Sequence, residues 1–151
     1  MMKSAIGGLL FMSIFFGVNH TAISAESEQR YISIRNTDSA WIQGVCSLVF
    51  RLDNGGDGEF KALAVSLQLT DKSGKALETG SLDVQPFGDS DATRSIDAAT
   101  EFSCDAVENT ANIVITKVDE IYPDGSVHTL PTTVFDPQYY QPLKISVGQS
   151  K

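Results

Sequence analysis

Apolar and polar residues alternate with a period of two through most of the chain beyond residue 30. The cleanest run is residues 62–70, in which Leu63, Val65, Leu67 and Leu69 fall on one face. Strands of this kind bury one face and leave the other in water, as antiparallel sheets do. Residues 45–52 show the same pattern, and shorter or looser versions of it predict further strands at residues 31–35, 76–84, 96–104, 112–122, 127–130 and 142–147.

Turn-forming residues separate these runs. Glycine-rich or proline-containing connections occupy residues 53–58, 71–75, 86–91 and 123–125. No stretch keeps a 3.6-residue period, and although residues 103–109 could form one helical turn, no helix is predicted there. About eight strands with regular turns predict an all-β fold, an antiparallel two-sheet sandwich.

The first 25 residues have the pattern of a secretory signal. Lys3 precedes an uncharged apolar run at residues 5–18, and small residues follow at positions 22–25. The run is shorter than the roughly 20 residues that a membrane-spanning helix needs. We therefore expect cleavage after Ala25, export of the protein, and a single domain over residues 26–151.

Cys46 and Cys104 are the only cysteines, and both follow the predicted signal. In an oxidising compartment, an even pair in a domain of this size predicts one structural disulfide. Two thiols with one distant histidine are too few ligands for a tetrahedral metal site. Trp41, the only tryptophan, precedes Cys46 and is expected to pack over the core, with ligand binding as the alternative.

Charge and candidate chemistry exclude several classes of function. The net charge of −8 argues against binding to nucleic acid or to an anionic membrane surface. His128 is the only histidine after the predicted signal, and no G-x-S-x-G motif is present, so we predict no catalytic residues and no cofactor. Asp89 and Asp91 could bind calcium weakly, although a solvated turn is the favoured interpretation and no metal site is predicted.

Residues 134–142 combine three aromatic side chains with two prolines. Such a segment could contact another protein, could pack its rings under a crossover loop, or could act as a stiff hinge for exchanging a terminal strand between two copies. The candidate interface or hinge residues are Phe135, Pro137, Tyr139, Tyr140 and Pro142.

Three runs, together with the secretory start, resemble the interleukin receptor mimic family known from pathogenic Escherichia coli. They are residues 31–39 (YISIRNTDS), residues 45–55 with Val45-Cys46 and FRLDNG, and residues 86–95 (PFGDSDATRS). The resemblance implies a secreted sandwich of the fibronectin type III or immunoglobulin kind that forms a strand-exchanged homodimer. It also implies binding of host cytokines such as interleukins 2, 4 and 10, with modulation of immunity and a role in virulence.

The residues themselves leave a second class of function open. Fimbrial and other cell-surface subunits are also exported, all-β and cross-linked by one cysteine pair, and a neighbour's strand completes their sandwich. A long N-terminal segment of alternating hydrophobic residues would favour that class. Residues 26–30 are short and polar instead, so a secreted, non-enzymatic binding module is the preferred hypothesis.

Overall fold

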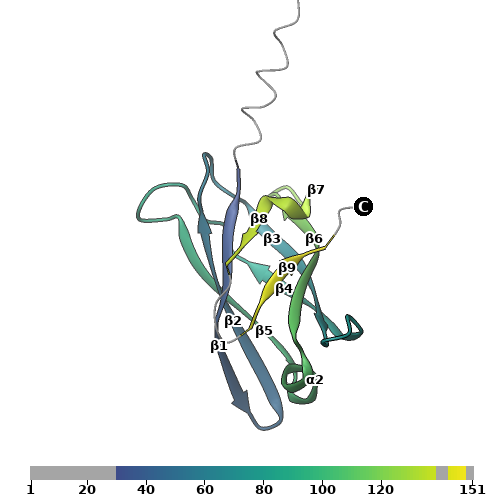
Figure 1. The fold of residues 1–151 in the computed structure, drawn as a ribbon. Helices are drawn as coiled ribbons and strands as arrows, with labels where there is room; N and C mark the ends of the chain where they lie inside the picture. The colour runs from purple at the N-terminus through teal and green to yellow at the C-terminus, as the bar shows by residue number, and fades with distance from the viewer. Residues whose placement is uncertain (1–29, 139–142, 149–151) are drawn as a thin grey trace, which may run out of the picture.

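The structure, a computed structural model, describes residues 30–138 and 143–148, which hold nine strands and one short α-helix (Figure 1). The predicted signal at residues 1–25 lies outside the described residues, and so do Tyr139, Tyr140 and Pro142. The elements are β1 (Ile32–Ile42), β2 (Val45–Asn54), β3 (Ala62–Thr70), β4 (Ala76–Val84), β5 (Ser95–Ser103), α2 (Cys104–Asn109), β6 (Asn112–Ile121), β7 (Val127–Leu130), β8 (Phe135–Pro137) and β9 (Ile145–Val147).

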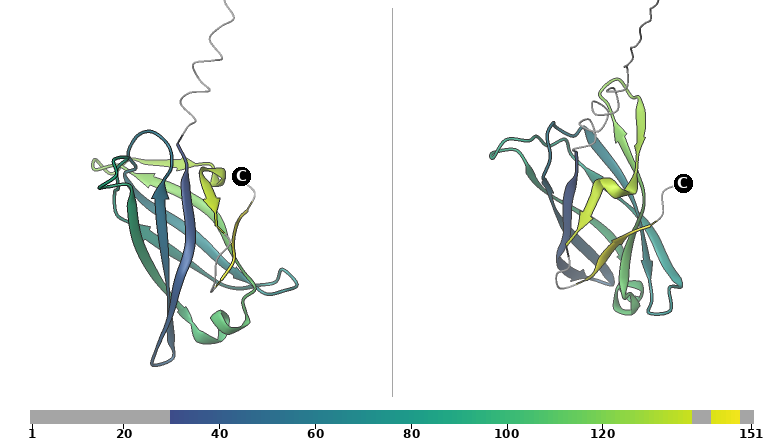
Figure 2. Two further views of the ribbon diagram at one scale, coloured as in Figure 1. Left: turned by 60° about the vertical axis from the view of Figure 1, so that its left-hand side comes forward. Right: turned by 45° about the horizontal axis from the view of Figure 1, so that its top comes forward.

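The strands form two sheets that face each other, as Figure 2 shows from two directions. The first sheet has the order β5-β2-β1-β8, and the second has the order β4-β3-β6-β7, with β9 also paired to β6. Most neighbours are antiparallel, but β1 pairs with β8 and β6 pairs with β9 in parallel. The predicted all-β sandwich is thus confirmed, and both parallel pairings involve the C-terminal strands.

The core lies between the sheets and consists of the apolar positions that the alternation predicted. Leu48, Phe50 and Leu52 of β2 face Leu63, Val65, Leu67 and Leu69 of β3, and all are essentially inaccessible to solvent. On one side the edge strands β4 and β5 come close together. A Cβ atom at Gly80 would lie 2.7 Å from Cε1 of Phe102, so the glycine makes room for that ring.

The predicted disulfide joins Cys46 to Cys104, whose Cα atoms are 5.0 Å apart. It ties the start of β2 to the start of α2, where Ser103 Oγ accepts a hydrogen bond from the Ala106 N–H and caps the helix. The helix is six residues long and lies within residues 103–109, where the sequence allows one helical turn but did not lead us to predict it.

β1 is longer than the short first strand predicted at residues 31–35. It continues to Ile42 because Thr37 forms a β-bulge, after which pairing with β2 resumes at Asp38. Asn36 is fully buried at the bulge, and its side-chain amide donates to the carbonyl oxygens of Asp38 and Val49. The bulge thereby keeps its backbone groups satisfied, and the β1–β2 hairpin can extend beyond the sandwich.

The C-terminal strands cross from one sheet to the other. β8 pairs with Ile32–Ile34 of β1, and β9 then pairs with Ile113–Ile115 of β6. The side-chain oxygen of Asn36 accepts a hydrogen bond of 3.1 Å from the Leu143 N–H, which fixes the approach to β9 against β1. β8 is a strand that the sequence did not predict, since residues 134–142 had been interpreted as a connection.

Candidate protein-binding surface

The end of the β1–β2 hairpin exposes three large apolar side chains. Trp41 is 66% exposed, Ile42 is 63% exposed and Val45 is 40% exposed. Gln43 and Gly44 make the two-residue turn between them with φ values of 53° and 86°, as a type I′ hairpin turn requires. Figure 1 and the left view of Figure 2 show this hairpin extending beyond the other elements, at the end of the molecule that also holds α2. We call Trp41, Ile42 and Val45 the tip patch.

The expectation that Trp41 packs over the core was wrong. Trp41 pairs with Cys46, whose side chain is buried, so it does lie on the core-facing side of β1. The hairpin, however, continues past the region that the second sheet covers, and the indole is left largely in water. Exposed tryptophan is frequent where proteins bind other proteins, because its ring supplies much contact area.

The predicted interface or hinge residues are divided between the core and the crossover. Phe135 begins β8 and is buried, so its ring packs into the core. Pro137 ends β8, and the next residue, Gln138, donates its N–H to the Ile34 carbonyl oxygen at 2.8 Å. The part of the segment that contains Tyr139, Tyr140 and Pro142 lies outside the described residues.

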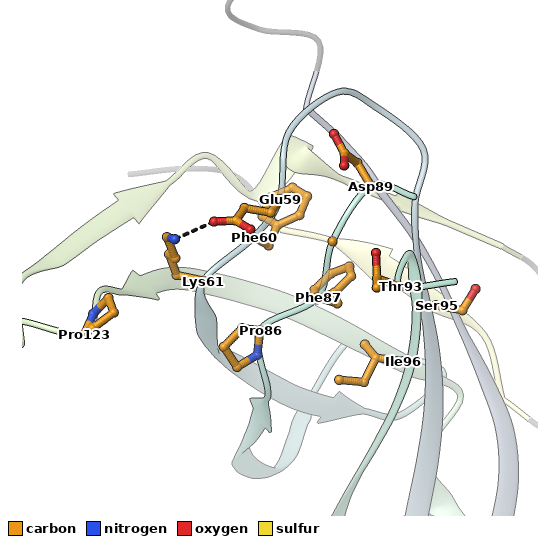
Figure 3. Close-up of a pocket in the computed structure, with 11 residues that line it drawn as sticks. Glu59, Phe60, Lys61, Pro86, Phe87, Asp89, Thr93, Ser95, Ile96 and Pro123 are labelled. Atoms are coloured by element: carbon orange, nitrogen blue, oxygen red, sulfur yellow. Dashed lines mark hydrogen bonds and ion pairs between the residues drawn. The ribbon is translucent and has the colours of Figure 1, made fainter. Parts of the chain in front are cut away.

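At the opposite end from the tip patch, an open hollow of about 600 Å³ lies between the loop after β4 and residues 59–61, which precede β3 (Figure 3). Phe60 and Phe87 stack at its base with ring centroids 5.3 Å apart. At its rim Lys61 is paired with Glu59, as the dashed line in Figure 3 marks. The rings are themselves buried in the core, and the hydroxyl of Ser95, which also lines the hollow, donates to the Asp53 carboxylate.

A half-buried ion pair lies against the Phe60 ring. Nη2 of Arg30 donates to Oε2 of Glu120 at 2.8 Å, and the guanidinium lies 4.2 Å from the centre of the Phe60 ring. The Lys61 N–H donates to the same carboxylate at 3.0 Å. Burial would raise the pKa of Glu120, but the hydrogen bonds from Arg30 and Lys61 outweigh it and hold that pKa below its ordinary value of 4.5. The pair fixes the start of β1 against β6.

We predict that Glu120→Gln removes a pH-dependent part of the stability. Because the folded protein binds this proton less tightly than the unfolded chain, ionised Glu120 stabilises the fold above pH 4.5, and the contribution is lost as pH falls through the folded pKa. At pH 7 the variant should unfold with about 2 kcal/mol less free energy, a typical value for charge-assisted hydrogen bonds. Urea unfolding of both proteins at pH 7 and at pH 3 measures their free energies of unfolding. If the difference between the two proteins were the same at both pH values, the prediction would be contradicted.

Asp89 contributes to loop structure. Its carboxylate accepts a hydrogen bond of 2.8 Å from the Gly58 N–H, which joins the loop before β3 to the loop after β4. Asp91 is fully exposed and lies 3.8 Å from Arg94. Across residues 30–138 and 143–148, no three His, Cys, Asp or Glu side chains gather in a way that could hold a metal ion.

His128 lies on β7, and its ring contacts Tyr122 edge-on, with centroids 4.7 Å apart. The hydroxyl groups on either side of it donate to turn and strand carboxylates, Ser126 to Asp124 and Thr129 to Asp119, both at 2.7 Å. Both hydroxyl groups therefore stabilise the local turn and strand through these hydrogen bonds. None of the helices in the described part of the chain has the length and apolar character needed to span a bilayer.

The fold and this surface define a small, disulfide-linked β-sandwich with an apolar hairpin end available to other proteins. The chain belongs to the family of interleukin receptor mimic protein A (IrmA), whose family model matches residues 32–138. Among solved structures, IrmA from Escherichia coli is 50% identical, with a TM-score of 0.68, over 76% of this chain and 97% of that one.

Two other comparisons add nothing to this assignment. A β-glucosidase from Kluyveromyces marxianus matches at 11% identity and a TM-score of 0.26, over 67% of this chain and 14% of that one, which is too weak to support an argument. No curated protein sequence matches the chain.

Proposed function

We propose that this protein is a secreted, non-enzymatic receptor mimic that binds host interleukins and so modulates immunity. The observation that carries the proposal is its membership of the interleukin receptor mimic family, together with 50% identity to IrmA over nearly the whole of that chain. The disulfide supports an oxidising, extracellular destination, to which cleavage of the signal at residues 1–25 would deliver the protein. An exposed apolar hairpin end supports action by contact with another protein.

A titration of the purified protein against interleukins 2, 4 and 10 tests this proposal. We expect saturable binding of at least one interleukin, and no binding of an unrelated acidic protein used as the control. Absence of binding to all three, under conditions in which each interleukin still binds its own receptor, would contradict the proposal.

We propose further that the protein forms a homodimer by exchange of β9. In the single chain, two backbone hydrogen bonds flank the β6–β9 pairing: Ile113 N–H donates to the Lys144 oxygen, and Gly148 N–H donates to the Ile115 oxygen. The same hydrogen bonds could form between β6 of one copy and β9 of the other. Only the connection between β8 and β9 would have to change its path, so that it leads to the second copy. In the sequence, Pro137 and Pro142 each restrict one φ angle in the short segment that joins β8 to β9, and short connections under strain promote exchange of a terminal strand.

Lengthening this hinge should convert dimer to monomer. We predict that six Gly/Ser residues inserted after Gln138 allow β9 to return to its own β6, while the same insertion after Gly74, in the β3–β4 turn, leaves the dimer intact. Light scattering measures the mass of each protein over a range of concentrations. A monomeric unaltered protein, or a dimer that survives the hinge insertion, would contradict strand exchange.

The sequence before β1 disfavours the fimbrial alternative. Residues 26–30 are short and polar, whereas a fimbrial subunit needs a long donor segment of alternating hydrophobic residues to complete a neighbour's sandwich.

A further inference from the structure

The tip patch is the largest concentration of exposed apolar side chains on the described part of the chain. Of the five large hydrophobic residues that are exposed within residues 30–138 and 143–148, three fall within five consecutive positions: Trp41, Ile42 and Val45. The other two, Tyr31 and Val127, lie apart from it in sequence and at other strand ends. Exposed apolar groups gathered in this way mark a contact site more often than scattered ones do.

The hairpin presents this patch on both of its faces. Trp41 shares the core-facing side with Cys46, whereas Ile42 and Val45 pair with each other on the outer side. The Cys46–Cys104 disulfide lies directly beside the patch, because Cys46 is opposite Trp41 in the β1–β2 pairing, and it anchors this end of the hairpin to α2. A hairpin end held in this way is suited to entering a depression on a partner, at little entropic cost.

The charges around the patch specify the partner's chemistry. The outer face of the first sheet continues from Val45 to Glu101, which lies beside Ser47, and to Asp38, which lies beside Val49. Asp105 and Glu108 are exposed on α2, at the same end of the molecule. Residues 36–50 and 98–109, which form this end of the first sheet and α2, include no lysine or arginine. The charged side chains of the first sheet and α2 around the patch are thus all negative, and the positive charge that lies beside α2 is Lys72 of the β3–β4 turn, which lines a hollow together with Glu108.

From these observations we infer that the β1–β2 hairpin end is the surface through which the protein binds its partner, and that the partner presents an apolar depression bordered by lysine and arginine side chains. The inference rests on the proposed function, because it takes the bound interleukin as that partner. Trp41 fills the depression, and Asp38, Glu101 and α2 face the basic border. An anionic membrane is disfavoured as the occupant, since it would repel the same carboxylates.

Trp41 is also a built-in reporter, because the sequence contains no other tryptophan. Protein labelled with 5-fluorotryptophan should give one ¹⁹F resonance, at a position typical of an indole exposed to water. Addition of interleukin 2, 4 or 10, whichever binds in the titration above, should shift or broaden this resonance. The resonance should not move when the protein alone is diluted, or when neutral phosphatidylcholine vesicles are added.

Variants test the energetic role of the patch. Trp41→Ala should weaken binding by at least about tenfold, as expected for a central contact residue. The matched control is Val127→Ala, which truncates an exposed apolar side chain 56% accessible on β7 and should leave binding unchanged. Glu101→Gln should weaken binding less than Trp41→Ala and should reduce its dependence on salt concentration. Because all three side chains are exposed, unfolding midpoints should match that of the unaltered protein.

The outcomes separate this inference from the function on which it rests. If the unaltered protein binds an interleukin and Trp41→Ala binds it equally well, the hairpin is not the contact surface and the inference alone is overturned. A ¹⁹F shift caused by vesicles or by self-association, without any caused by the interleukin, overturns it as well. If the unaltered protein binds none of the three interleukins, the proposed function and this inference both fail.

Discussion

Replacing both Cys46 and Cys104 with alanine should lower the free energy of unfolding by about 4 kcal/mol, as expected from chain entropy for a closed loop of 58 positions. The bond ties β2 of the first sheet to α2, the short helix that leads into β6 of the second sheet. Without it the unfolded chain gains freedom, while the strands themselves keep their contacts. Urea unfolding of the unaltered protein with and without reductant, and of the double variant, measures the effect.

The double variant also serves as the control for the reductant. Its unfolding midpoint should not respond to reductant, whereas that of the unaltered protein should fall to about the same value. Equal midpoints for the unaltered protein in both conditions would show that the disulfide contributes no stability.

Phe50→Ala should cost about 3–5 kcal/mol, the usual range for removing a fully buried aromatic side chain. Phe50 lies at the middle of β2, between β1 and β5, with its ring in the core. The truncation would leave a cavity between two sheets that the disulfide and the strand pairings hold in place, so little collapse can compensate. Val127→Ala, an exposed truncation on β7, should change the stability by less than about 0.5 kcal/mol. Similar midpoints for these two variants in urea would contradict the description of the core.

The strands with strict alternation could be predicted from the sequence almost residue by residue. The bounds predicted for β3, β4 and β7 are those observed, because a period-two pattern and a glycine or proline turn define each of them. β8 was missed because it has only three residues and is held by parallel pairing to β1, about 100 positions earlier in the chain. Local patterns carry no information on such a pairing.

The surface was harder to predict than the core. The bulge at Thr37 shifts the alternation along β1, so the side of the sheet on which Trp41 lies could not be read from Ile32 and Ile34. Its exposure depends on where the second sheet ends, which is a property of the assembled sandwich. The Gln43-Gly44 pair between two apolar runs was the available signal for a tight hairpin at this point. The Arg30–Glu120 pair, 90 positions apart, likewise had no signal in the sequence.

The most direct test of receptor mimicry is competition with an authentic receptor. An interleukin that binds the protein should be held at a fixed concentration with its own receptor ectodomain immobilised, while the soluble protein is added in increasing amounts. The account predicts that the fraction of interleukin displaced from the receptor equals the fraction bound by the soluble protein. The Trp41→Ala variant should need an at least about tenfold higher concentration for the same displacement. Formation of a complex that contains interleukin, receptor and this protein together would contradict it, because a mimic occupies the receptor's own place on the cytokine.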